Sequence, residues 1–220
     1  MAFFGRRRRS ASEQNEPEEA DLPLEPEQDA AESDEPQPGP KDSEGVPIPA
    51  GYVDLGSLFV PPVPGMQVRA QFEEDGKTLH RIMLILGTSG IRVSVAAAPR
   101  SGGVWDELRQ QLADGVSSQG GKVTEVDGRY GKELQVRLPV QLPNGSQGFT
   151  PMRFIGVEGP RWVTRLDVQG AAAAGDKEQE EACDQVIDQL IVNRGSEPRV
   201  RLSLLPLQLP RDAARATDQS

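Results

Sequence analysis

The sequence predicts an α+β fold, with a mostly antiparallel sheet of about seven to eight strands packed with two amphipathic helices and preceded by a disordered acidic arm. Three observations lead to this prediction. Several segments alternate apolar and polar residues with a period of two, and turn-forming residues separate them. Two other segments carry apolar residues at helical spacing. The N-terminal region has too few apolar residues to form a core.

The arm is defined by its charge. Residues 10–45 contain thirteen acidic residues, one basic residue and six prolines, and Leu22 and Leu24 are the only strongly apolar residues larger than alanine. Such a segment buries too little apolar surface to offset the entropy lost on ordering. The net charge of the chain is −10, but residues 46–220 contribute only −2 of it. We therefore expect a nearly neutral folded domain behind an acidic arm.

The composition divides the chain into four parts. Residues 1–45 form the arm, with a basic start, and residues 46–65 form a proline-rich lead-in that packs on the domain without regular structure. Residues 66–210 form the α+β domain, and residues 211–220 form a polar tail.

The first half of the domain is predicted to be a three-stranded meander followed by a helix. Strands are expected at residues 66–72, 78–86 and 91–95, with Asp75-Gly76 as the first turn. Residues 104–118 then place apolar side chains on one helical face, namely Trp105, Leu108, Leu112 and Val116.

The second half continues with strands at residues 122–126, 132–140, 149–157 and 161–168. A helix is predicted over residues 177–193. Asp176 is its N-cap, Gly195 follows its end, and its apolar stripe includes Val186, Ile187 and Leu190. A final strand is expected at residues 200–205.

One stretch of the sequence resembles a known family. The residues Gly159-Pro160-Arg161-Trp162, together with residues 150–157 of the strand predicted over 149–157, are similar to those of an actinobacterial family known only as a domain of unknown function. The resemblance covers most of the chain and implies an actinobacterial origin without implying an activity. The order of elements is also loosely similar to that of PsbP-like α+β sandwiches, an analogy of fold that carries no function.

Catalytic chemistry has little support in the composition. A hydrolase triad or a zinc site needs several converging His, Cys and carboxylate side chains, and the chain has one histidine and one cysteine. We expect His80 to be a packing or sheet-edge residue and Cys183 to be a buried thiol on the second helix. The P-loop, GxGxxG and GxSxG patterns are absent from the sequence, and residues 100–103 before the first helix are a connection more often than an anion site. The sequence thus predicts no catalytic, cofactor-binding or metal-binding residues.

Arginines are the remaining candidates for a site. Arg153, Arg161 and Arg165 lie on adjoining predicted strands, and alternation places Arg161 and Arg165 on one face. They could form a patch for an anion or a partner, or they could pair with acidic neighbours such as Asp167 or Glu158.

A second basic cluster lies at the N-terminus and consists of four adjacent residues, Arg6, Arg7, Arg8 and Arg9. These side chains could contact phosphate in nucleic acid or in anionic lipid. They are equally able to pair with the acidic arm.

The prediction for function is a non-catalytic interaction or structural module with an unknown protein partner. One alternative is a nucleic-acid-associated protein that uses the N-terminal arginines. The other is a small-ligand binder or enzyme with an arginine-lined groove. The longest apolar run, residues 82–86, is too short to span a bilayer, and the single cysteine agrees with a reducing cytoplasm. We therefore expect a cytoplasmic protein without a transmembrane segment.

Overall fold

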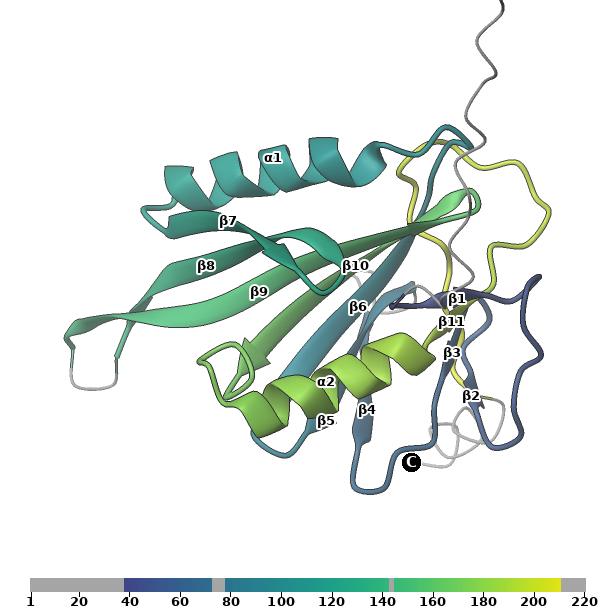
Figure 1. Cartoon of the computed structure of the whole chain (residues 1–220), viewed down its shortest axis with the longest axis horizontal. Coiled ribbons are helices and arrows are strands. Elements are labelled where there is room, and N and C mark those ends of the chain that lie inside the picture. Colours follow the sequence, from purple (N-terminus) through teal and green to yellow (C-terminus); the bar gives the residue numbers. More distant parts are fainter. Residues whose placement is uncertain (1–37, 73–77, 143–144, 211–220) are drawn as a thin grey trace, which may run out of the picture. The chain divides into compact units, whose positions relative to one another are not determined.

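The computed structural model describes residues 38–72, 78–142 and 145–210. Two sheets and two helices account for the regular structure of these residues (Figure 1). The elements, in chain order, are β1 (Lys41–Asp42), β2 (Val53–Asp54), β3 (Leu58–Val60), β4 (Gln67–Phe72), β5 (Leu79–Leu86), β6 (Ser89–Ala97), α1 (Val104–Ser118), β7 (Lys122–Gly128), β8 (Gly131–Gln141), β9 (Gln147–Gly159), β10 (Trp162–Gly170), α2 (Lys177–Gln189) and β11 (Ile191–Val192).

The larger sheet has seven strands in the order β4-β5-β6-β10-β9-β8-β7, and every neighbouring pair is antiparallel. The smaller sheet has the order β1-β11-β3-β2, and its β1–β11 pair is parallel. Together with the two helices, these sheets confirm the predicted α+β class. In the described residues, neither helix is long and apolar enough to cross a membrane.

The helices lie on opposite faces of the seven-stranded sheet. The strands of this sheet alternate, so Ile155 of β9 points towards α2 while Phe154 points towards α1. Helix α2 contacts β5 and β6, whereas α1 contacts β7, β8 and β9 (Figure 1). Each helix therefore closes a separate apolar cluster against its own half of the sheet.

The cluster under α2 is the larger of the two. It joins the apolar faces of β5, β6 and β10 to the smaller sheet and to the buried stripe of α2, which contains Cys183, Val186 and Ile187. Burial of such side chains stabilises the fold by roughly 1.5–3 kcal/mol each. The smaller cluster centres on Trp105 of α1, whose ring packs directly over Gly156.

The predicted helix over residues 177–193 begins as expected but ends earlier. Asp176 caps it, accepting hydrogen bonds from the backbone N–H groups of Glu178 and Gln179. The helix stops at Gln189 because Ile191 and Val192 form β11, which pairs with β1 and β3. The expected end near Gly195 was therefore wrong.

Three further boundaries differ from the predictions. The lead-in over residues 46–65 contains β2 and β3, because its prolines lie before β2 or after β3 and leave the N–H groups of these short strands available for pairing. The predicted final strand at residues 200–205 forms one isolated bridge, between Leu204 and Ala96. The predicted arm boundary at residue 45 is also too late, since β1 lies at Lys41–Asp42. Residues 1–37 and the predicted tail over 211–220 lie outside the described residues.

Candidate functional site

The three arginines for which the sequence leaves a patch or ion pairs open lie in different places. Arg153 is on β9 and points towards α2, while Arg165 on β10 points to the opposite face of the sheet. Arg161 is not on a strand at all. It occupies the turn between β9 and β10 with a positive φ of 65°, and its guanidinium lies 3.5 Å from Glu44. The alternative of one patch made by all three arginines therefore does not hold, whereas the other alternative, pairing with an acidic neighbour, holds for Arg165 and Asp167.

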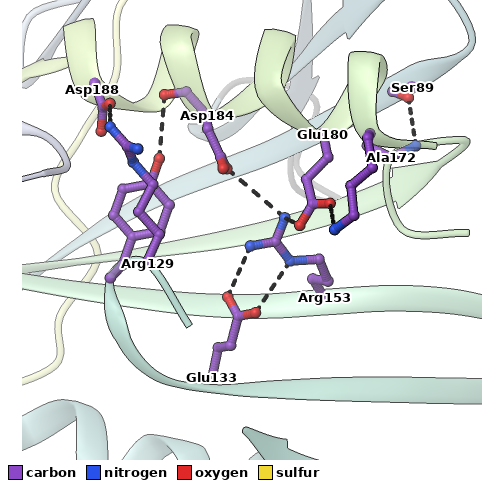
Figure 2. Close-up of polar contacts among 10 residues, drawn as sticks. Ser89, Arg129, Glu133, Arg153, Ala172, Glu180, Asp184 and Asp188 are labelled. Atoms are coloured by element: carbon purple, nitrogen blue, oxygen red, sulfur yellow. Dashed lines mark hydrogen bonds and ion pairs between the residues drawn. The ribbon is translucent and has the colours of Figure 1, made fainter. Parts of the chain in front are cut away.

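Arg153 is the centre of a buried polar cluster between the sheet and α2 (Figure 2). Its Nε and Nη2 donate to the two carboxylate oxygens of Glu133 on β8, at 3.3 and 3.1 Å. Its Nη1 donates to Glu180 at 3.0 Å and lies 3.8 Å from Asp184 Oδ1. We call these four residues the Arg153 network. It joins β8 and β9 to α2 by charged groups.

The network holds more negative than positive charge. Burial acts to lower the pKa of Arg153, but its hydrogen bond with Glu133 and the surrounding carboxylates outweigh that effect and raise the pKa. Burial raises the pKa of Asp184, and the nearby Glu180 adds to the effect. Lys177 at the edge of the network reduces the imbalance, because it pairs with Glu180 at 2.6 Å. Beside the network, Arg129 pairs with Asp188 at 2.5 Å (Figure 2).

A groove of about 650 Å³ lies beside this network. Its floor is formed by β7, β8 and β9, and its wall is formed by the turn before α2 and the first residues of that helix. The N–H of Ala172 in this turn donates to Ser89 Oγ at 2.9 Å, which fixes the wall to β6 (Figure 2). The side chains that give the groove its chemistry are Lys122, Thr124, Gln135, Arg137, Phe149, Arg153, Lys177 and Glu180.

Two cations on the floor have no acidic partner among the described residues. Lys122 of β7 and Arg137 of β8 are directly opposite each other in the strand register, and neither takes part in an ion pair there. The Lys122 ammonium lies 5.6 Å from the centroid of the Phe149 ring, which is half exposed. Arg153 differs from them, because its three nitrogens already face carboxylates. The groove therefore offers Lys122 and Arg137 to a ligand.

A family described as "Protein of unknown function (DUF3710)" matches residues 39–216. The chain belongs to this family. The predicted membership of a family known only as a domain of unknown function is thus confirmed. Comparison with curated proteins found no significant match.

The start of α1 in the DUF3710 domain is not an anion site. The N–H of Gly103 donates to Glu158 Oε2 at 2.8 Å, and the N–H of Trp105 donates to the other oxygen of the same carboxylate. Glu158 therefore occupies the positive end of the helix, and it forms no ion pair with an arginine among the residues that the structure describes. The alternative that residues 100–103 serve as a connection agrees with this geometry.

The single cysteine and histidine of the DUF3710 domain lie away from the groove lining. Cys183 is fully buried on α2, as predicted, and burial raises the pKa of its thiol to about 11. His80 is half-buried on β5, beside the edge strand β4. Among the described residues, no group of three or more His, Cys, Asp or Glu side chains could hold a metal ion. The N-terminal cluster Arg6, Arg7, Arg8 and Arg9 lies outside the described residues.

Lys122 and Arg137 are not among the site residues that the sequence predicts. Alternation along the two predicted strands gives each residue a face, but the pairing register that places them opposite each other is a tertiary feature. A signal was present in the sequence, since both are cations on predicted strands with the turn-forming pair Asp127-Gly128 between them. In the structure this pair ends β7, and Arg129-Tyr130 connects β7 to β8.

Proposed function

We propose that the DUF3710 domain is a non-catalytic binding module that takes an anionic ligand in the groove beside the Arg153 network. The juxtaposition of Lys122 and Arg137 carries this proposal. Like charges opposite each other on paired strands destabilise a sheet. Among the residues that the structure describes, no carboxylate forms an ion pair that would offset the repulsion between Lys122 and Arg137. A bound phosphate or carboxylate group would offset it and would gain two charge-assisted hydrogen bonds.

The remaining groups of the groove favour binding over catalysis. Thr124 and Gln135 supply a hydroxyl and an amide, and Phe149 supplies an exposed apolar ring. A general acid or base needs a carboxyl or imidazole that can reach the ligand. The lining carboxylate, Glu180, is already engaged by Arg153 and Lys177. This supports a non-catalytic interaction module, with an unknown protein as the alternative occupant.

The finer predictions from the sequence remain part of this proposal. A cytoplasmic location is supported by the single cysteine, which is a buried free thiol. An actinobacterial origin is supported by the residues around the β9–β10 turn, and the PsbP-like analogy by the order of strands and helices. The alternative of a groove lined by Arg153, Arg161 and Arg165 is not part of this proposal, because the groove contains only Arg153 of these three and the arginine that it offers to a ligand is Arg137.

Thermal unfolding of the full chain tests the proposal. The probes are inorganic phosphate, pyrophosphate and citrate, with glucose as a neutral control. Each is added at about 10 mM, which is ten times a Kd of about 1 mM. We expect at least one anion to raise Tm in the natural protein. The double variant Lys122→Ala/Arg137→Ala should lose the shift.

The matched control is Arg100→Ala, which removes an exposed arginine outside the groove. This variant should keep the full shift. An equal shift in the double variant, or no shift with any of the three anions, would contradict the proposal.

A further inference from the structure

The face of the seven-stranded sheet that points away from α2 carries four arginines on its β4, β5, β6 and β10 strands. We call it the arginine face, and its charged members are Arg69, Arg81, Arg92, Arg165 and Asp167. Four cations and one anion give this face a net charge of +3, although residues 46–220 as a whole carry −2. We propose that the arginine face binds the phosphodiester backbone of nucleic acid without regard to base sequence.

The strand register spreads the arginines over the surface. Arg69, Met83, Arg92 and Asp167 follow one another across β4, β5, β6 and β10 as register partners. Strands are spaced by about 4.8 Å, so the Cα atoms of Arg69 and Arg92 lie about 10 Å apart. Arg81 lies two residues before Met83 on β5, Arg165 lies two residues before Asp167 on β10, and both are on the same face. The charge thus extends in two directions, which suits a polymer better than a single small anion.

Two of the arginines have no acidic partner in the part of the chain that the structure describes. Arg81 is exposed and makes no ion pair there, and Arg69 donates only to the neutral Gln67, at 3.2 Å. The other two share one buried carboxylate. Arg165 binds Asp167 at 2.7 and 3.0 Å and Arg92 lies 3.6 Å from it, which fixes both guanidiniums in place. Arg165 is held further by the Phe154 ring, 5.1 Å from its guanidinium carbon.

The other side chains of this face favour nucleic acid over an acidic protein. Gln67, Gln71 and Ser94 lie between the arginines, while Met83 is buried and Ile85 is half-buried. Protein interfaces are centred on apolar and aromatic side chains, and none is exposed on these strands of the face. Nucleic-acid interfaces are polar and positive, and guanidinium groups bind phosphate in bidentate fashion. Without an exposed ring for base stacking, the contacts reach the backbone alone.

Fluorescence anisotropy tests this inference with the full chain and a fluorescein-labelled single-stranded oligothymidylate, and with a mixed-sequence duplex of equal length. We expect both probes to bind at low salt, with affinity that falls steeply as salt rises. The variant Arg69→Glu/Arg81→Glu changes two exposed side chains, so folding is preserved. It should weaken binding at least tenfold and make the slope of log K against log salt shallower by about 1.4 for the single strand.

Two matched variants separate this face from other sites. The first variant, Lys122→Glu/Arg137→Glu, changes the net charge by the same amount as Arg69→Glu/Arg81→Glu, but within the groove. The second variant replaces the N-terminal arginines with alanine, at Arg6, Arg7, Arg8 and Arg9. Both should bind the oligonucleotide within about twofold of the natural protein, since neither alters a contact of the arginine face. The inference would be overturned if either variant lost as much affinity for the oligonucleotide as Arg69→Glu/Arg81→Glu, or more. That result would not decide the proposed function of the groove, which the thermal unfolding experiment tests separately.

A competition distinguishes nucleic acid from acidic protein. Poly-L-glutamate should displace the oligonucleotide less well than unlabelled DNA at equal charge concentration, because carboxylates spaced on a peptide do not reproduce the phosphate backbone. If poly-L-glutamate competes better than DNA, the face recognises an acidic polypeptide and the inference fails.

Discussion

The two helices pack on opposite faces of one sheet, yet they are attached to it in different ways. Helix α2 is attached by a buried apolar stripe and by the Arg153 network, in which a charged residue of β9 reaches two carboxylates of the helix. Helix α1 is attached by one large ring, Trp105, seated on Gly156, and by Glu158, which binds its first N–H groups. Two helices of similar amphipathic pattern can therefore depend on different interactions for their stability.

Removal of the Arg153 side chain should give the largest effect. Arg153→Ala leaves Glu133 buried and without its cation, a change that typically costs about 3–5 kcal/mol. Chemical denaturation measures the loss in the free energy of unfolding. Arg165→Ala is the matched control on the opposite face, where Asp167 keeps Arg92 as a partner. Equal losses for the two variants would show that the network does not attach α2 to the sheet.

Truncation of the apolar end of α2 tests the stripe itself. Leu190 is fully buried just after the helix, and Leu190→Ala should cost about 2–5 kcal/mol. Its exposed neighbour offers the control, since Gln189→Ala should change stability by less than about 0.5 kcal/mol. Urea titration measures the free energy of unfolding of both variants. Equal and small losses in the two would contradict the burial of this segment.

The contact between α1 and the sheet should be sensitive to one added methyl group. A Cβ at Gly156 would lie 2.0 Å from Cδ2 of Trp105, so Gly156→Ala must displace the ring. Overpacking of this kind costs about 1–3 kcal/mol. Gly115→Ala in α1 is the control, because its Cβ would meet nothing within 4 Å and the helix propensity favours alanine by up to about 1 kcal/mol. We expect Gly156→Ala to lower the melting temperature and Gly115→Ala to raise it.

The helix caps should give the smallest effects and the most direct comparison. Asp176→Ala removes a cap supplied by the residue next to α2 and should cost about 1 kcal/mol. Glu158→Ala removes the corresponding group at α1, supplied by β9, and a comparable loss is expected. Asp176→Ser should restore most of the stability in the first case. If neither alanine variant alters the denaturation midpoint, the caps do not stabilise these helices.

The start of each helix and the positions of the main strands could be predicted from local patterns. Asp176 next to an apolar stripe predicts the first turn of α2, and the glycines at residues 102 and 103 precede the first turn of α1. The ends of elements were less predictable. Ile191 and Val192 continue the helical stripe in sequence, but they pair with β1 and β3, and such long-range pairing overrides helix propensity.

The residues of the candidate groove were also not predictable from local patterns in the sequence. The sequence singled out Arg153, Arg161 and Arg165 because they are arginines on neighbouring strands. The structure separates them, since Arg165 faces the other side of the sheet and Arg161 lies in a turn. Lys122 and Arg137 are brought together by a hairpin register, which depends on how the whole β7–β8–β9 unit pairs.

The sequence by itself determined the class of fold, the burial of the cysteine and the main helices and strands, because these depend on periodicity and on residues close to one another in the chain. The tertiary structure alone decided which charges are neutralised. Arg153 and Glu133 become a buried pair, whereas Lys122, Arg137, Arg69 and Arg81 keep their charge without an acidic partner in the described residues. The physical reason is that an ion pair requires a few ångströms of separation, and strand register and helix placement set that distance between residues far apart in the chain.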